Sequence, residues 1–350
     1  MRERRKGEHL RGAVALPDGP ALPGFGDISI VHNALADASW DEISLKTQFC
    51  GKGVPTPFFI NAITGGGDES GPFNKALAKV AGSRGLALAV GSQRVALGSS
   101  SGRDSFEVVR ENNPRGVVFA NLGVNATPEE AHEAVEMIEA DFLQLHLNTP
   151  QELVMPEGDR SFSSATKRVA EISEAVSVPV VVKEVGFGIS REVAGRIANT
   201  GASALDVGGK GGTNFLAIED WRREASRLPS DLLNWGLTTA VSLIEVVTAK
   251  TGLEVVASGG IRTGLDAAKC LALGAGLCGV AKPFYQAYVE GGLGGIERLA
   301  DSLLWELKLV MALCGCEKPD DMIAIPMVIA GETRQWLDAR GIDLRQFAAR

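Results

Sequence analysis

Short apolar runs recur along the chain, and the segments between them place apolar residues at helical spacing. Eight such runs occur, at residues 58–62, 87–91, 116–123, 142–148, 179–185, 204–209, 254–260 and 277–283. Their length and composition predict strands, whereas apolar residues three and four apart predict helices. Strands that alternate with helices favour a parallel sheet, and eight repeats predict an α/β fold, the (β/α)8 TIM barrel.

Helix boundaries are marked in several of the connecting segments. Thr127 precedes Pro128 and two glutamates, which predicts an N-cap, a first-turn proline and acids at the positive end of the helix dipole. Segments 190–201 and 263–275 carry glycine at or near their ends, as expected where a left-handed residue stops a helix before the next strand.

The pattern predicts one domain in three parts. Residues 1–57 form an amino-terminal arm and lead-in, 58–284 the barrel core, and 285–350 closing helices, whose apolar stripe suits either the barrel exterior or a subunit interface. Two stretches that follow strands, 155–164 and 211–236, are long for barrel loops and are predicted to act as lids or ligand shells.

Charge and composition exclude some classes of function. The chain carries a net charge of −8, with 45% hydrophobic and 22% charged residues. This balance argues against a nucleic-acid partner, which needs an extended basic surface. The exception is the amino terminus, where Arg2, Arg4, Arg5, Lys6 and Arg11 form either a solvated tail or an arm that folds over a phosphorylated ligand.

Neither a secretory signal nor a membrane-spanning segment is predicted. Prolines interrupt the stretch after the basic run, and no apolar segment reaches membrane-spanning length. The five cysteines are odd in number and scattered, which is typical of reduced thiols in a cytoplasmic protein.

The end of the predicted strand 142–148 is the strongest candidate for chemistry. His146, Asn148, Gln151 and Glu152 follow one another over seven residues at a strand's carboxyl end, where α/β proteins bind ligands. The structural alternative is an ordinary capped turn. Glu152 is the best Mg²⁺ candidate, because diphosphate-bound Mg²⁺ keeps several waters and can use a single protein carboxylate.

Two glycine-rich strand ends predict a phosphate site. In many barrels, backbone N–H groups of the last two strand-helix turns hold a phosphate. The residues that would form this cradle are Gly259, Gly260, Ile261, Arg262, Ala281 and Lys282. Lys183, which leaves an apolar strand, needs an anionic partner, and a flavin ring could supply one.

Taken together, these segments resemble the type 2 isopentenyl-diphosphate isomerases, which use FMN to interconvert isopentenyl and dimethylallyl diphosphate. The resemblance covers most of the chain through RKGEHL, NAITGGG, GSQR, ANLG, LHLNTPQE, MPEGDRSF, VKEVGFG, DVGGKGGTNF, ASGGIRTG and GVAKPF. Two departures concern the flavin site: Gly208 stands where many relatives carry serine, and Ile63 replaces a commoner methionine.

The resemblance implies a set of site residues. FMN would be bound by Ala62, Ile63, Thr64, Ser92, Asn121, Lys183, Gly208, Thr213, Gly259, Gly260, Ile261, Arg262, Ala281 and Lys282. The substrate diphosphate would be bound by Arg5, Lys6, His9, Ser92, Gln93, Arg94 and Gln151, with Asn148 beside it and Glu152 on Mg²⁺.

The implied chemistry moves a double bond by proton transfer without net redox change. Reduced FMN would supply the unusual acid-base group, Gln151 would orient or relay on the opposite side, and His146 would polarise the pocket. The resemblance also implies NADPH as reductant and a homo-oligomer, a tetramer or an octamer. Two alternatives stay open: another FMN-dependent barrel oxidoreductase, disfavoured because no histidine follows His146, or a noncatalytic flavin or prenyl-phosphate binding protein.

Overall fold

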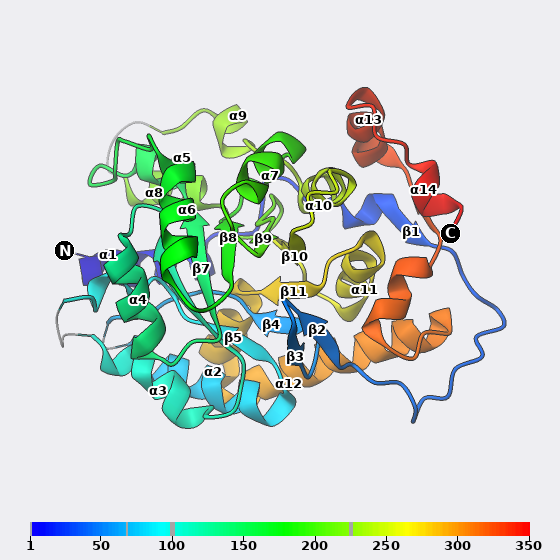
Figure 1. Cartoon of the computed structure of the whole chain (residues 1–350), viewed down its shortest axis with the longest axis horizontal. Coiled ribbons are helices and arrows are strands. Elements are labelled where there is room, and N and C mark those ends of the chain that lie inside the picture. The colour runs from blue at the N-terminus through cyan, green and yellow to red at the C-terminus, as the bar shows by residue number, and fades with distance from the viewer. Residues whose placement is uncertain (1, 68, 99–101, 224–226) are drawn as a thin grey trace.

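A computed structural model describes residues 2–67, 69–98, 102–223 and 227–350, and the side chains from Gly7 onward within these ranges. Eight parallel strands close into a barrel in the order β10-β11-β4-β5-β6-β7-β8-β9, with helices around it (Figure 1). The strands are β4 (Phe58–Ile60), β5 (Ala87–Ala89), β6 (Val118–Gly123), β7 (Phe142–Leu147), β8 (Val180–Glu184), β9 (Ala204–Asp206), β10 (Glu254–Ser258) and β11 (Leu277–Val280). The predicted TIM barrel and its eight strands are confirmed.

Helices connect the strands and surround the barrel. They are α2 (Ser70–Arg84), α3 (Asp104–Asn112), α4 (Pro128–Met137), α5 (Thr149–Val154), α6 (Ala165–Ala175), α7 (Arg191–Ala198), α8 (Phe215–Arg222), α9 (Ser230–Leu233), α10 (Thr239–Thr248), α11 (Gly264–Leu273) and α12 (Lys282–Cys314). The predicted start of α4 is confirmed: Thr127 and Glu130 form a reciprocal capping box, and Pro128 is the first helical residue. Gly274 ends α11 in the left-handed conformation.

Segments outside the barrel contain elements that the hydrophobic pattern did not predict. β1 (Ile28–Ile30) pairs antiparallel with β12 (Met327–Ile329), so the lead-in and the closing segment join next to α13 (Gly331–Ala339) and α14 (Arg345–Ala348) (Figure 1). A hairpin of β2 (Thr47–Phe49) and β3 (Lys52–Val54) places Phe49 5.6 Å from Phe142, ring centre to ring centre, at the floor of the barrel. The amino-terminal arm is a helix, α1 (Arg2–Ala15), which packs on α8.

The predicted lid 211–236 is not a simple loop, because it contains α8 and α9. The Asn214 side chain caps α8 by accepting a hydrogen bond from the Ala217 N–H, and Leu216 and Ile218 are buried. Because glycines precede this short helix, the spacing of apolar residues did not predict it. By contrast, no helix or strand occurs between α5 and α6, over residues 155–164.

The barrel interior is built in two layers, because side chains two residues apart on a strand point to the same face. The lower one, here called the apolar layer, consists of Phe59, Phe119, Phe142, Val181, Ala204 and Val256. The upper one, the polar layer, lies two residues further along the same strands and consists of Asn61, Asn121, Gln144, Lys183, Asp206 and Ser258. The polar layer faces the carboxyl ends of the strands.

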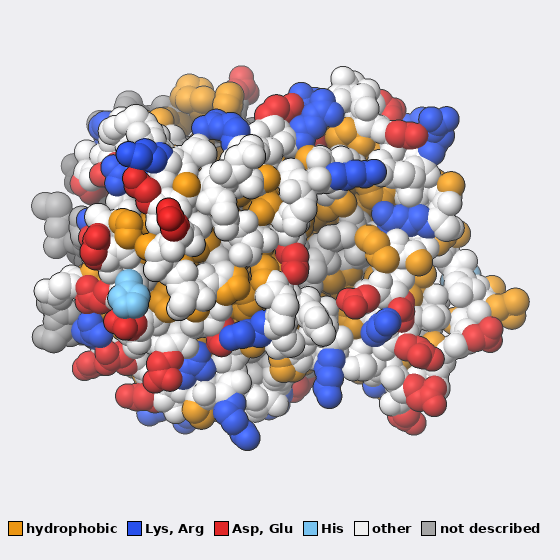
Figure 2. Space-filling view, in the orientation of Figure 1, with side chains coloured by type: hydrophobic (Ala, Val, Ile, Leu, Met, Phe, Trp, Pro, Cys, Tyr) orange, Lys and Arg blue, Asp and Glu red, His pale blue; other side chains and the backbone are white. Residues whose placement is uncertain are grey.

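None of the helices within the described ranges is both long enough and apolar enough to cross a membrane. All five cysteines are free thiols, four of them buried. On the face drawn in Figure 2, lysine and arginine side chains alternate with aspartate and glutamate.

Candidate active site

A cavity of about 590 Å³ opens above the polar layer, at the carboxyl ends of the barrel strands. Its volume lies within the range of about 300–1,000 Å³ that is typical of small-molecule and cofactor sites. Most predicted site residues line it: His9, Ala62, Ile63, Thr64, Ser92, Arg94, Asn121, His146, Asn148, Gln151, Glu152, Lys183, Gly208, Thr213, Gly259, Gly260, Arg262, Ala281 and Lys282. The fold therefore brings together residues that are spread along the chain from His9 to Lys282.

Four predicted site residues need separate comment. Arg5 and Lys6 belong to α1, but their side chains lie outside the described part of the structure, so their role stays a prediction. Gln93 is fully buried: its Nε2 donates to the Ala134 carbonyl at 2.8 Å, and its Oε1 accepts from the Asn121 N–H. Both ends of the Gln93 amide are thus used within the barrel wall, so a diphosphate contact at this residue would involve its backbone and stays a prediction.

The side chain of Ile261 is also buried in the core and does not line the cavity. Only its backbone borders the glycine turn, where its carbonyl accepts a hydrogen bond from Arg262 Nη1 at 2.8 Å. A contact through the backbone is what the predicted phosphate cradle requires at this position, and it stays a prediction.

The glycine turn after β10 forms the predicted phosphate cradle. Gly259 has a φ of +104°, and a Cβ atom there would lie 2.1 Å from the carbonyl oxygen of Gly209. Only glycine fits this approach of two backbones. The N-terminus of α11 follows the turn, and Arg262 and Lys282 add positive charge. These features fit a phosphate group such as that of FMN.

Asp18, which sequence reasoning missed, lies against both of these cations. Its carboxylate accepts from Arg262 Nε at 3.0 Å and pairs with Lys282 Nζ at 2.9 Å. Burial alone would raise the pKa of Asp18, but Arg262 and Lys282 outweigh it and hold that pKa below its ordinary value. Since Asp18 lies more than 200 residues from either cation in the sequence, no local pattern announces the contact.

Gly208 occupies a second restricted position, with a φ of +45°. A Cβ atom there would lie 2.0 Å from the Glu184 carbonyl oxygen, so a larger residue would need a shift of the backbone. This clash gives a physical reason for glycine at the position where we noted a departure from serine.

Two residues that line the cavity, Gln151 and His9, both contact the buried carboxylate of Glu219. Gln151 Nε2 donates to Glu219 Oε1 at 3.0 Å, and His9 Nε2 lies 2.7 Å from the same oxygen. Arg222 pairs with the other oxygen of Glu219. Burial would raise the pKa of Glu219, but His9, Gln151 and Arg222 together lower it, so the carboxylate is the favoured form.

This cluster joins the arm to the barrel, because His9 comes from α1, Gln151 from α5 and Glu219 from α8. Sequence reasoning missed Glu219 because it lies in the helix concealed within the predicted lid. The only signal in the sequence that could have identified Glu219 was a carboxylate among apolar residues at helical spacing.

Glu152 presents an ordered carboxylate to the cavity. Its Oε1 accepts from Asn148 Nδ2 at 2.9 Å, and its Oε2 accepts from the Asp159 N–H at 2.8 Å. In the described ranges, no group of three or more His, Cys, Asp or Glu side chains could hold a metal ion. A lone oriented carboxylate fits Mg²⁺ that is held mainly by water and substrate phosphates.

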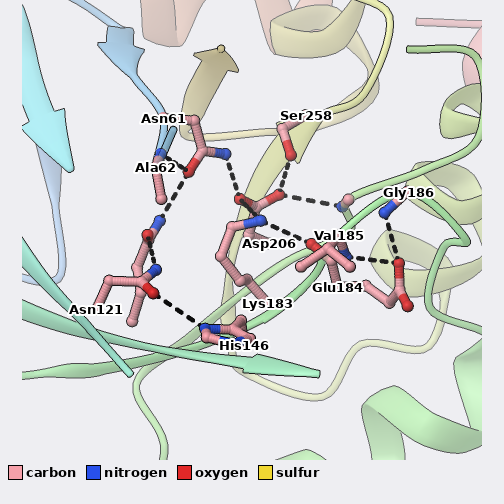
Figure 3. Close-up of polar contacts among 12 residues, drawn as sticks. Asn61, Ala62, Asn121, His146, Lys183, Glu184, Val185, Gly186, Asp206 and Ser258 are labelled. Atoms are coloured by element: carbon pink, nitrogen blue, oxygen red, sulfur yellow. Dashed lines mark hydrogen bonds and ion pairs between the residues drawn. The ribbon is translucent and has the colours of Figure 1, made fainter. Parts of the chain in front are cut away.

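Lys183 has a buried anionic partner, as expected from its place on an apolar strand. Its Nζ lies 3.7 Å from Asp206 Oδ2 and donates to the Glu184 carbonyl at 2.7 Å (Figure 3). Burial raises the pKa of the neighbouring Glu184 to about 7, although its carboxylate accepts backbone N–H bonds from Val185 and Gly186. The partner of Lys183 is thus a protein carboxylate.

The fold and the cavity define the class. Residues 120–325 match the family model described as FMN-dependent dehydrogenase. A mandelate oxidase mutant with benzaldehyde is similar in structure, with a TM-score of 0.68, 19% identity, and coverage of 93% of this chain and 98% of that chain. A flavocytochrome b2 with sulfite bound has a TM-score of 0.65 and 19% identity, and covers 89% of this chain and 77% of that chain. These likenesses show the fold of an FMN-dependent dehydrogenase barrel.

Sequence relatives give the narrower assignment. An isopentenyl-diphosphate delta-isomerase of Geobacillus sp. is 45% identical, over 100% of this chain and 99% of the relative. One from Moorella thermoacetica is 46% identical over 97% of each chain. The chain therefore belongs to the isopentenyl-diphosphate delta-isomerase family, which confirms the resemblance stated above.

Proposed function

We propose that this chain interconverts isopentenyl diphosphate and dimethylallyl diphosphate, using reduced FMN and Mg²⁺. The observation that carries the proposal is that one cavity is lined both by a glycine and cation cradle for one phosphate and by Gln151 and Glu152, with the buried Glu219 hydrogen-bonded to Gln151. A cofactor phosphate and a substrate diphosphate would thus enter from different sides. Full-length identity to named isomerases supports the same function.

FMN would be held by the residues of the barrel mouth. Its phosphate would lie on the turn at Gly259 and Gly260, next to Lys282, and its ring would lie over Lys183. When bound in its reduced form, FMN supplies the acid-base group for proton transfer to or from carbon. The Lys183 ammonium would stabilise negative charge at the position where the ring lies.

The diphosphate would bind between the arm and the polar loops. Arg94 and His9 line this side of the cavity, and Arg5 and Lys6 are proposed to close over it from α1. Glu152 would hold a Mg²⁺ ion that neutralises the diphosphate. Binding at this end leaves the apolar carbon chain directed toward the interior of the cavity.

Gln151 would orient the second proton transfer. Because an amide is a poor acid, we assign Gln151 an orienting role, and its hydrogen bond to Glu219 fixes the orientation of its amide. The Glu219 carboxylate, kept in its charged form by His9, Gln151 and Arg222, would hold the Gln151 amide in one orientation at the cavity wall.

The rival oxidoreductase reading has a specific weakness. Hydroxy-acid oxidases of this barrel type usually need a histidine and arginine pair late in the chain, as base and as clamp for the substrate carboxylate. No histidine follows His146 in this chain. NADPH as flavin reductant, a tetramer or octamer, and a cytoplasmic location complete the proposal, the last supported by five free thiols.

The test is turnover in deuterated water. Purified protein is incubated without oxygen with FMN, dithionite, Mg²⁺ and isopentenyl diphosphate, and dimethylallyl product is followed by NMR. Deuterated product that forms only with reduced FMN is expected. Glu152→Gln serves as the matched variant, in which the Mg²⁺ requirement should rise while FMN still binds. Folded, FMN-loaded protein that forms no product would contradict the proposal.

A further inference from the structure

We propose that Asp206 is a positioning residue that sets the tautomer of His146 through a directional chain of hydrogen bonds across the barrel. The inference deepens the proposed function, on which its kinetic meaning rests, since His146 lines the active-site cavity and Asp206 does not. The side chain of Asp206 is fully buried.

The chain runs through four side-chain hydrogen bonds. Asn61 Nδ2 donates to Asp206 Oδ2 at 2.8 Å, and Gln144 Nε2 donates to Asn61 Oδ1 at 3.1 Å. Asn121 Nδ2 then donates to Gln144 Oε1 at 2.9 Å, and its own Oδ1 lies 3.0 Å from His146 Nδ1. Figure 3 shows both ends of this chain, which runs from β9 to the residue after β4, then to β7, to β6 and back to β7.

The direction of every link follows from its carboxylate end. An ionised carboxylate only accepts, so Asn61 must present its NH₂ group to Asp206 and its oxygen to Gln144. The Ala62 N–H also donates to Asn61 Oδ1, at 2.8 Å, which independently fixes the same orientation. Each following amide must then turn in the same sense.

His146 ends the chain of amides, and the orientation of Asn121 fixes its tautomer. Because Asn121 uses its NH₂ group on Gln144, only its Oδ1 faces the imidazole, and Nδ1 must be the donor. A neutral His146 therefore carries its proton on Nδ1, and Nε2 is its acceptor nitrogen. The imidazole is prepared to accept, rather than to donate, at Nε2.

The surroundings of Asp206 suit this terminal role. Its Oδ1 accepts from Ser258 Oγ at 2.5 Å and from the Gly208 N–H at 3.1 Å. Its Oδ2 accepts from Asn61 and faces the Lys183 ammonium at 3.7 Å. All four partners are donors, which matches the accepting capacity of an ionised carboxylate.

One carboxylate therefore organises two cavity groups. Through its charge it places the Lys183 ammonium, and through the amide chain it gives His146 its tautomer. A network of this kind is effective only when each member is satisfied, because a reversed amide would bring two donors or two acceptors together.

The test measures the tautomer directly in protein without substrate. The chain has four histidines, so ¹⁵N-histidine labelling gives few signals, and the His146→Gln variant assigns the one from His146. Magic-angle-spinning NMR is performed at mildly alkaline pH, where an ordinary imidazole is neutral. Wild-type protein is expected to show the Nδ1–H form. An Nε2–H form in the wild type would overturn the proposal.

Asp206→Asn tests the origin of the effect, because its amide can donate and releases the chain from a single direction. The ratio of tautomers is expected to shift toward Nε2–H by about tenfold or more, as for loss of a hydrogen bond to a charged group. Gln144→Met, which cuts the chain but keeps the Asp206 and Lys183 pair, should give the same shift if Asp206→Asn does not fold.

Glu245→Gln is the matched control. Its carboxylate is also buried and bonded, to Arg340 Nε at 2.8 Å and Trp336 Nε1 at 2.9 Å, but it is not part of the chain. This variant should leave the His146 signal unchanged. An unaltered tautomer in Asp206→Asn would overturn the proposal. No turnover is measured, so failure of the isomerase assay would not affect this result.

Discussion

The two layers of the barrel interior come from the same six strands yet do different work. In the apolar layer, Phe119 stacks on Phe142 with ring centres 4.5 Å apart and on Phe59 at 5.4 Å. Such contacts are additive and largely nondirectional. In the polar layer, two residues further along, Asn61 and Asn121 belong to a chain in which each donor has one acceptor. The apolar layer stabilises the barrel by packing, whereas the polar layer orients side chains at the cavity through directional hydrogen bonds.

The largest expected effect comes from opening the apolar layer. Phe119→Ala removes a fully buried ring from a stack of three and should lower the free energy of unfolding by about 3–5 kcal/mol. Denaturant unfolding measures the change. The ¹⁵N signal of His146 should keep its Nδ1–H form in this variant, and a changed tautomer would show that the layers are not independent.

The second effect concerns a carboxyl group at the rim of the polar layer. The pKa of Glu184 is raised from 4.5 to about 7, so between these values the folded protein binds a proton that the unfolded chain has lost. Its contribution to stability is fully present below pH 4.5 and is lost as the pH rises toward 7. Over this window, wild type should lose about 3 kcal/mol relative to Glu184→Gln.

Unfolding of both proteins between pH 4.5 and 7 gives this comparison. Parallel stability profiles would mean that the backbone N–H groups bonded to Glu184 compensate its burial fully. The charged form of Glu184 would then be as well stabilised by its hydrogen-bond donors as the buried carboxylate of Asp206 is by its own donors.

The barrel strands could be predicted from the sequence more completely than the contacts that complete the polar layer and the cavity. The eight strands and the glycine cradle follow local patterns, and Gly259 could be assigned because its conformation depends on adjacent residues. Asn121 was expected at the flavin site from the family resemblance, but its link to Asn61 through Gln144 depends on barrel closure, which brings distant strands together. Glu219 and Asp18 contact cavity residues that are distant in sequence, so no local pattern reveals them.

A smaller effect, on FMN affinity, is expected at the phosphate cradle, where Asp18 comes from the segment before the barrel. Asp18 is partly exposed and shares Arg262 and Lys282 with the proposed FMN phosphate. Removing its charge in Asp18→Asn should tighten FMN binding about fivefold, the effect of roughly 1 kcal/mol for an ion pair near the surface. Flavin fluorescence titration measures the dissociation constant.

Asp343→Asn, which alters an exposed ion pair with Arg345 far from the cradle, is the control and should leave FMN affinity unchanged. Weaker FMN binding in Asp18→Asn would instead mean that the carboxylate orients the two cations for the phosphate.

We infer that the polar layer directs the chemistry, whereas the apolar layer only packs. The most direct measurement compares kcat for isomerisation in Gln144→Met and Phe119→Leu, neither of which touches the cavity. We predict that Gln144→Met lowers kcat by about 10–100-fold, as for loss of an orienting outer partner, with FMN still bound. Phe119→Leu should keep a nearly normal kcat despite lower stability. Equal kcat values in the two variants would contradict the account.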